Sequence, residues 1–281
     1  MRRFRRRAVV CAAAAGVGLA VCGALATRAA GAGLAHGHVV HIVKPGLGVN
    51  ANQSNNWFGY NQGTLEQGGK RFHSIAADWK VPAASPHTRG QDEASSDWIG
   101  IGGGCVDASC TVTDNTLIQT GTEQDVSASG KASYSAWWEL IPGPSLTIGK
   151  MTVRPGDRTH AAIAETVSGS NVWRITLRDV TRGETFTRTV PYSSTQATAE
   201  WIEETPLVIG TNAGLSPLPN LSRTAFDSGR TNGAPAHLKG SERILLTDAN
   251  GKVIGTPSAP DSDLDGFGLC AWATSCSVPP S

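Results

Sequence analysis

The feature that most constrains the fold of this chain is a two-residue alternation of apolar and polar side chains, broken by frequent turns. Residues 172–179 show it clearly, because Trp173, Ile175 and Leu177 fall on one face of an extended chain and polar residues on the other. After the N-terminal segment no long stretch keeps a helical period, and 33 glycines with 15 prolines suit many short strands. The pattern predicts an all-β protein, an antiparallel sandwich or a barrel.

One hairpin and several turns are expected. Residues 244–256 contain two apolar runs around Asn250-Gly251, and Asn-Gly between apolar runs is the strongest short-range signal of a β-hairpin. Further turns are expected where glycine interrupts the chain, at residues 142–144, 154–157 and 181–184. No internal repeat and no dividing linker appear, so we expect one domain over residues 53–281.

The N-terminus has the composition of a secretory signal peptide. Five arginines precede an apolar run from Ala8 to about Ala26, and small residues follow this run. The run is long enough to cross a bilayer, so a retained anchor is the alternative. Its Ala, Gly and Val composition favours cleavage, and we expect a signal peptide over residues 1–32 and a secreted, extracellular protein without membrane contact. Residues 33–52 are Gly-rich and polar, which predicts a short propeptide or a disordered lead-in.

The cysteines indicate disulfide bonds. Two of the six lie in the leader, and four remain in the exported chain: Cys105, Cys110, Cys270 and Cys276. An even number of cysteines outside the cytosol is typical of disulfides. Close spacing favours Cys105–Cys110 and Cys270–Cys276, each contributing about 2 kcal/mol through the closed loop. The crossed pairings stay open, and zinc binding is the weaker alternative.

The charge of the chain argues against a nucleic-acid partner. The formal net charge is +1, and it becomes mildly negative once the leader and its arginines are removed. No basic patch with interleaved aromatic residues appears, so we expect no nucleic-acid binding.

Six short segments resemble, in the same order, the conserved motifs of one family of peptidases. They are NNWFGY (55–60), DWKVP (78–82), DWIGIGG (97–103), LIQTG (117–121), YSAWWEL (134–140) and AEWIEE (199–204). In the glutamic peptidases, or eqolisins, the matching motifs include A-W-V-G-I-D-G, I-L-Q-T-G, Y-D-A-W-Y-E-W and A-E-[WF]-I-[VI]-E. Because the resemblance extends over most of the mature chain, the sequence is identified as a member of this family, similar to its bacterial branch.

The resemblance implies a glutamic endopeptidase on an antiparallel β-sandwich of two curved sheets, of the jelly-roll or concanavalin-like kind. It matches Gln119 to the family's catalytic glutamine and Glu204 to its catalytic glutamate. The residues that it places beside the substrate are Trp57, Trp98, Trp137, Glu139 and Glu123. It implies no metal and no cofactor. The expected partners are protein or peptide substrates, and we expect a monomer.

An amide and a carboxyl group can together hydrolyse a peptide bond. The glutamate takes a proton from water as general base and later returns it to the leaving amine. The glutamine offers an uncharged NH₂ group that donates to the developing oxyanion, which a carboxylate cannot do. Burial raises a carboxyl pKa and donated hydrogen bonds lower it, so the surroundings of Glu204 decide the working pH.

The chain departs from the family pattern at two acidic positions. Gly102 and Ser135 stand where the family has aspartates, and Glu123 retains the acidic position after the catalytic glutamine. We therefore expect weaker carboxylate repulsion at Glu204 than in the carboxyl-rich fungal members. These two differences should affect the pH optimum and the substrate-binding subsites more than the class of reaction. We still expect the enzyme to work at acidic pH.

Other motifs and functions fit less well. Asp227-Ser228-Gly229 resembles half of an aspartic-peptidase signature, but it occurs once, so we expect a turn. Residues 261–266 begin like a calcium loop, yet Trp272 stands where that loop needs its glutamate, so we expect an acidic turn. The alternatives to a peptidase are a carbohydrate-binding sandwich, in which tryptophans stack on sugars, and an inactive family member. A glycosidase would need two facing carboxylates.

Overall fold

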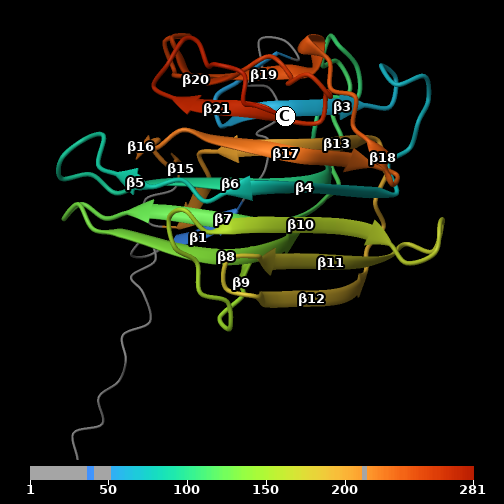
Figure 1. Ribbon diagram of the computed structural model, residues 1–281, viewed down its shortest axis with the longest axis horizontal. Coiled ribbons are helices and arrows are strands. Elements are labelled where there is room, and N and C mark those ends of the chain that lie inside the picture. Colours follow the sequence, from blue (N-terminus) through green and yellow to red (C-terminus); the bar gives the residue numbers. More distant parts are fainter. Residues whose placement is uncertain (1–36, 41–51, 211–213) are drawn as a thin grey trace, which may run out of the picture. The chain divides into compact units, whose positions relative to one another are not determined.

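Two large antiparallel sheets form a sandwich in the computed structural model, which describes residues 37–40, 52–210 and 214–281 (Figure 1). Sheet I consists, in spatial order, of β12 (Glu184–Pro191), β11 (Val172–Asp179), β10 (Arg158–Glu165), β4 (Ser74–Lys80), β17 (Thr224–Thr231), β21 (Phe267–Ala271) and β20 (Val253–Pro257). Sheet II consists of β19 (Arg243–Thr247), β3 (Trp57–Gly63), β13 (Thr198–Glu204), β6 (Glu93–Gly102), β7 (Leu117–Val126), β8 (Ala132–Leu140) and β9 (Leu146–Thr147). The expected signal peptide, 1–32, lies outside the described residues, as does most of the lead-in, 33–52.

Strand β19 joins the two sheets. It pairs antiparallel with β20 of sheet I and with β3 of sheet II, so backbone hydrogen bonding continues from one sheet into the other along one edge. At the far end of the path, β12 and β9 do not pair with each other. The described strands therefore make a sandwich and not a barrel, which confirms the predicted fold class.

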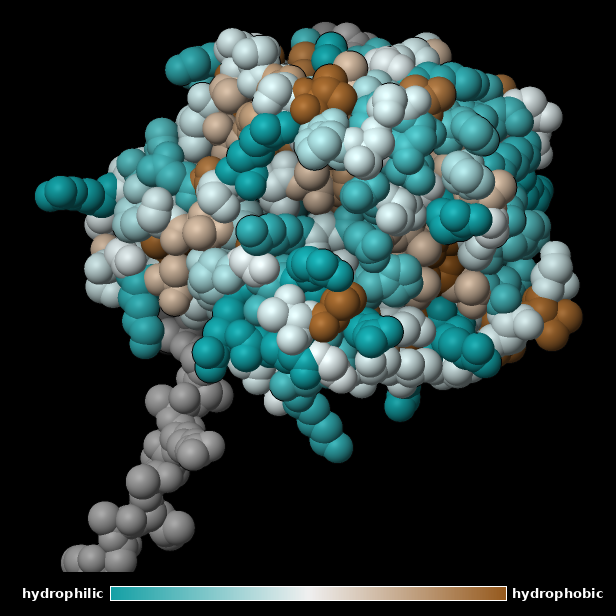
Figure 2. All heavy atoms as spheres, viewed as in Figure 1, coloured by the Kyte–Doolittle hydropathy of each residue, from teal (hydrophilic) through white to brown (hydrophobic). Residues whose placement is uncertain are grey.

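The main hydrophobic core lies between the sheets. The alternation predicted for 172–179 is strand β11, in which Trp173, Ile175 and Leu177 are fully buried. From the facing sheet, Ile99 and Trp201 reach the same core. The outward residues of β11 are polar, in keeping with the largely hydrophilic surface seen in Figure 2.

The C-terminal hairpin forms as predicted. Strands β19 and β20 pair antiparallel, and the loop between them turns at Gly251, whose φ is +79° and whose N–H donates to Asp248 O at 3.0 Å. The short elements are β2 (Gln53–Ser54), β5 (Ala84–Ser85), β16 (Asn220–Leu221), β18 (Ala234–Pro235) and the 3₁₀ turn η1 (Gly240–Glu242). Within the part of the chain that the structure describes, no helix is long and apolar enough to cross a membrane.

A small third sheet follows the end of β13. It consists of β1 (Gly37–Val40), β14 (Leu207–Gly210) and β15 (Gly214–Leu215), with β14 in the middle. The chain returns to sheet II at Pro217, whose carbonyl accepts a hydrogen bond from Ala94 N at 3.1 Å. Part of the expected lead-in thus adds a strand to the hairpin that begins just after Glu204.

The disulfides form between the close neighbours, Cys105 with Cys110 and Cys270 with Cys276. The expected turn at Asp227-Ser228-Gly229 is wrong, because these residues lie inside β17. The register between β17 and β4 shifts between Asp227 and Arg230, and Ser228 has a φ of +54°. Small and turn-forming residues suit such a β-bulge, where one residue leaves the normal strand conformation.

Candidate active site

Four neighbouring strands of sheet II carry six of the seven predicted catalytic and substrate-binding residues on one face, and the seventh, Trp57, lies opposite Glu204 on β3. The strands β13, β6, β7 and β8 pair consecutively in antiparallel register. Three successive rows across them are Glu204–Ser96–Glu123, Ile202–Trp98–Gly121–Trp137 and Glu200–Gly100–Gln119–Glu139. Because alternate residues of a strand share a face, all of these side chains lie on the same face, which we call the site face.

The site face is the side of sheet II away from the main core. Its apolar residues, among them Trp57, Trp98 and Trp137, form a cluster separate from the core between the sheets. Trp138, the neighbour of Trp137, packs against the main core instead. The side chains of these adjacent tryptophans thus point to opposite faces of the sheet, as successive residues of a strand do.

Two glycines leave room for the ring of Trp98 between the rows of Glu204 and Gln119. A Cβ atom at Gly121 would lie 2.2 Å from Asp97 O and 2.6 Å from Trp98 Cβ. A Cβ atom at Gly100 would lie 2.9 Å from Trp98 Cζ3. The glycines of LIQTG and DWIGIGG are therefore needed for the close approach of the indole to the sheet.

Glu204 is held by groups that donate hydrogen bonds. Trp98 Nε1 donates to Glu204 Oε2 at 2.8 Å, and Asn56 Nδ2 lies 3.5 Å from Oε1. The ring of Trp57 packs edge-on against that of Trp98 with centroids 4.8 Å apart, which places a second indole beside the carboxyl group. Glu204 itself is fully buried. The carboxyl group therefore has a fixed position.

The surroundings of Glu204 raise its pKa well above the usual glutamate value. Burial has the largest effect, and the charge of Glu139 adds to it, with a smaller contribution from Glu123. The hydrogen bond from Trp98 and the nearby indole of Trp57 favour the ionised form and offset part of the rise. Burial and charge thus favour the protonated form that a general acid needs, and the hydrogen bond from Trp98 favours the ionised form that a general base needs.

Gln119 is oriented by a carboxylate on the next strand. It lies opposite Glu139 in the β7–β8 register, and its Nε2 donates to Glu139 Oε2 at 2.7 Å. Both side chains are fully buried. Glu139 thus contacts the amide of Gln119 and also raises the pKa of Glu204, which links the two predicted catalytic groups.

The remaining predicted site residues complete the same face. Trp137 Nε1 donates to Ser96 Oγ at 2.9 Å, and Ser96 lies opposite Glu204. Glu123 is 7% exposed, and its pKa is raised by burial and then by Asp125. Ser96 and Asn56 were not predicted. The alternation within β6 offers the signal for Ser96, which lies two residues before Trp98.

Gly102 explains one departure from the family pattern. Its φ is +96°, and a Cβ atom there would lie 1.9 Å from Thr116 O. An aspartate does not fit this backbone. Ser135, the other replacement, lies opposite Glu123.

A pair of carboxyl groups lies directly behind the site, on the core side of sheet II. Glu203 is opposite Asp97 in register, both are fully buried, and Gln124 Nε2 donates to Asp97 Oδ2 at 2.6 Å. Burial raises the pKa of Asp97 to about 6. The family motifs have alanine at the position of Asp97 and valine or isoleucine at that of Glu203. These two differences are the sequence signal from which the buried pair could have been predicted.

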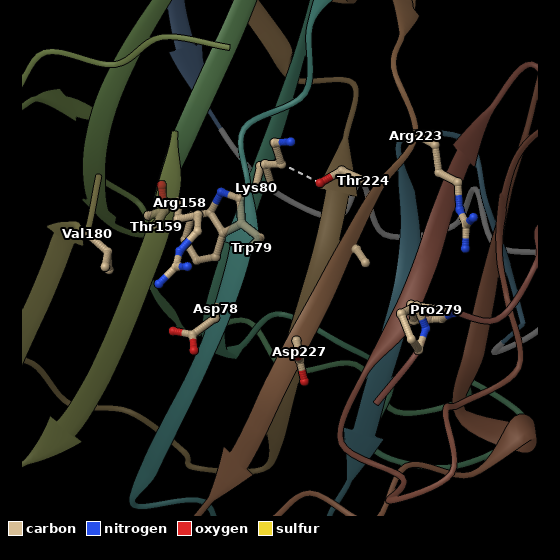
Figure 3. A pocket seen from close by; sticks show the side chains of 12 residues that line it. Asp78, Trp79, Lys80, Arg158, Thr159, Val180, Arg223, Thr224, Asp227 and Pro279 are labelled. Carbon is tan, nitrogen blue, oxygen red and sulfur yellow. Dashed lines mark hydrogen bonds between the residues drawn. The ribbon is translucent and has the colours of Figure 1, made fainter. Parts of the chain in front are cut away.

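A cavity of about 610 Å³ lies elsewhere, on sheet I (Figure 3). Charged side chains from β4, β10 and β17 line it, and none of the predicted catalytic or substrate-binding residues does. Its charged residues are Asp78, Lys80, Arg158, Arg223 and Asp227.

Residues 55–264 match the Peptidase A4 family. The fold is similar to that of scytalido-glutamic peptidase with a transition state analog inhibitor, with a TM-score of 0.58 and 18% identity over 77% of this chain and 98% of that one. It is also similar to SCP-B, a member of the eqolisin family, in complex with the tripeptide Ala-Ile-His, with a TM-score of 0.53 and 18% identity over the same shares. None of the curated proteins matches the chain.

The chain belongs to the peptidase A4 family, the eqolisins. It is a glutamic endopeptidase, and protein or peptide substrates follow from that class. The family assignment decides against a carbohydrate-binding sandwich.

Proposed function

We propose that this endopeptidase is secreted, works at acidic pH and hydrolyses peptide bonds with Gln119 and Glu204. One observation supports the pair above all. A buried carboxyl group and a buried amide share the site face, and Glu139 hydrogen-bonds the amide while its charge raises the pKa of the carboxyl group.

The proposed reaction needs no group beyond these side chains, water and the substrate. Ionised Glu204 accepts a proton from water, and the water oxygen attacks the scissile carbonyl carbon. The carbonyl oxygen becomes an oxyanion, to which the Gln119 amide donates. Glu204 then transfers its proton to the amine nitrogen as the C–N bond breaks, and the carboxylate is restored. Glu139 positions Gln119 by fixing the plane of its amide.

Substrate contacts are proposed for the aromatic and acidic residues around the pair. Trp57 and Trp98 hold Glu204, and Trp137 lies in the central row of the site face. In the structures with similar folds, one peptidase holds a transition state analog and another holds a tripeptide. We propose that a peptide lies across the same face here, contacting these tryptophans, Glu139 and Glu123.

The proposed precursor has a signal peptide, residues 1–32, a propeptide, residues 33–52, and the catalytic domain, residues 53–281. Strand β1 lies in the proposed propeptide and pairs with β14, which begins three residues after Glu204. This pairing supports a propeptide that contacts the catalytic domain. Gln119 and Glu204 have no exposed surface, so a substrate must displace whatever covers them. Export is supported by the disulfides.

Substitution of the two proposed catalytic residues tests the mechanism. We expect Gln119→Ala to lower kcat by about 10²–10³, the usual cost of one oxyanion donor, and Glu204→Gln to lower it at least as much. The measurement is casein or peptide hydrolysis at acidic pH with pepstatin present to inhibit aspartic peptidases. Glu184→Gln and Gln91→Ala, both away from the site face, should keep the wild-type rate. Wild-type turnover by a folded Glu204→Gln protein would disprove the assignment.

A further inference from the structure

Two acidic segments that lie apart in the sequence meet at one end of sheet I. Asp227 lies in the bulge of β17, and Asp261 and Asp265 lie in the loop before β21. Each of the three offers a carboxylate oxygen, and these oxygens all lie within 4.8 Å of one another. The two segments are the ones that the sequence suggested as turns, and the fold brings them together.

Backbone hydrogen bonds fix the carboxyl group of Asp261 and tie the two segments together. Asp261 Oδ1 accepts from Asp265 N at 3.2 Å and from Gly266 N at 3.1 Å, which closes the loop. Asp265 O accepts from Gly229 N at 2.8 Å, which ties the loop to the bulge. The cluster is therefore held by the fold and does not depend on side chains meeting by chance.

Buried oxygen atoms without a donor point to a ligand. Asp261 is 3% exposed, and its Oδ2 has no hydrogen-bond partner, nor does the buried Oδ1 of Asp265. A Cβ atom at Gly266 would lie 2.2 Å from Asp261 Oδ2 and 2.9 Å from the carbonyl oxygen of Phe226. Oδ2 therefore lies on the side of the loop that faces Phe226, the residue before Asp227 in β17. Leaving a carboxylate oxygen buried without a donor or a cation is costly.

The cluster also carries charge that no basic side chain balances. Asp263 adds a fourth carboxyl group to the same loop, and none of the ion pairs among the described residues involves any of the four. Carboxyl groups this close together repel one another when they are ionised. A bound cation would relieve this repulsion.

We propose that Asp227, Asp261 and Asp265 bind a calcium ion that fastens the loop before β21 to the bulge of β17. Calcium binds oxygen at about 2.4 Å, so two oxygens on opposite sides of it lie about 4.8 Å apart. The carboxylate oxygens of the cluster all lie within this span of one another. Magnesium binds at about 2.1 Å and requires a tighter set.

Solvent access suits calcium as well. Asp227 is exposed and lies at the edge of the cavity in Figure 3, so water can supply the remaining ligands of the six to eight that calcium takes. The glutamate missing at Trp272 does not matter here, because Asp227 comes from another strand and replaces a ligand from the end of the loop. The site is separate from Gln119 and Glu204.

Thermal unfolding and calorimetry of the purified, EDTA-treated protein test the proposal. Calcium at about 100 times its dissociation constant should raise the Tm by about 5–10 °C, with one site by titration calorimetry. Magnesium at the same concentration should give a smaller shift. Asp265→Asn should weaken calcium binding by about tenfold or more, since fewer ligand charges lower the affinity.

A matched control separates binding from damage to the fold. Asp92→Asn makes the same change at an exposed aspartate outside the cluster, one that accepts a backbone N–H from Ala128, and it should keep the full calcium shift. In EDTA, Asp265→Asn should be at least as stable as the wild type, because it removes repulsion. Absence of a calcium shift in the wild type, or an unchanged shift in Asp265→Asn, would overturn the proposal.

Discussion

Glu204 shows how a common side chain becomes a specialised one. Its sequence neighbours Glu200 and Glu203 have the same chemistry, and all three are fully buried. Glu204 differs in its neighbours, because Trp98 donates a hydrogen bond that fixes its position and Glu139 is the charge that contributes most to raising its pKa. Physical reasoning from the sequence could not choose among the three, and only the family motif, with its final glutamate, selected Glu204.

The coupling between Glu139 and Glu204 predicts a change in pH profile. The negative charge of Glu139 raises the pKa of Glu204, so Glu139→Gln should lower that pKa. A general base works when ionised, and the acidic limb of kcat/KM should therefore move to lower pH. Glu123→Gln should give a smaller shift in the same direction, because Glu123 contributes less. A limb that stays in place, or moves to higher pH, contradicts the coupling.

At the scale of strands, the sequence predicted well which segments form strands and poorly which strands pair with each other. The alternation at 172–179 and the Asn-Gly hairpin are local signals, and both elements form there. The register that brings Gln119 opposite Glu139 depends on long-range pairing of β7 with β8, which no local pattern encodes. The meeting of Asp227 with the 261–266 loop was missed for the same reason.

Close pairing of β6 with β7 predicts a strong effect at Gly121. Gly121→Ala places a methyl group 2.2 Å from Asp97 O, so the strands must separate and Trp98 must move. Overpacking of this kind costs about 1–3 kcal/mol, which lowers the Tm by at least about 2 °C. Scanning calorimetry and the peptidase assay should both register the change.

Gly149→Ala is the matched control for that substitution, since nothing lies within 4 Å of its Cβ position. It should leave both the Tm and the peptidase rate near the wild-type values. Equal behaviour of the two alanine variants would show that the strands tolerate a side chain at Gly121.

For the whole molecule, the buried acids predict greatest stability in acid. The pKa of Asp97 rises from 3.8 to about 6 on folding, and that of Glu203 rises well above 4.5. Below about pH 4 these groups are protonated in both the folded and the unfolded state, and their contribution to the free energy of unfolding is fully present. As the pH rises, the unfolded chain loses the protons first, so stability falls up to and through the folded pKa values. The Tm should therefore decrease between pH 4 and pH 7.

The double variant Asp97→Asn/Glu203→Gln tests the source of that slope. It keeps the shapes and the acceptor for Gln124 but removes both ionisations, so the Tm should change less over the same pH range. Asp92→Asn/Glu184→Gln, outside the buried pair, should keep the wild-type slope. A Tm that rises toward neutral pH in the wild type would contradict the account.

The joining of the two sheets by β19 has a consequence for the order in which the chain folds. Strand β3 is made early, yet both of its partners, β13 and β19, come from the last third of the sequence. The chain emerging from the ribosome cannot complete either sheet until residues beyond 243 are available. A product truncated before β19 would leave an edge of β3 bare and the two halves of the sandwich unlinked, which makes it a target for aggregation or degradation.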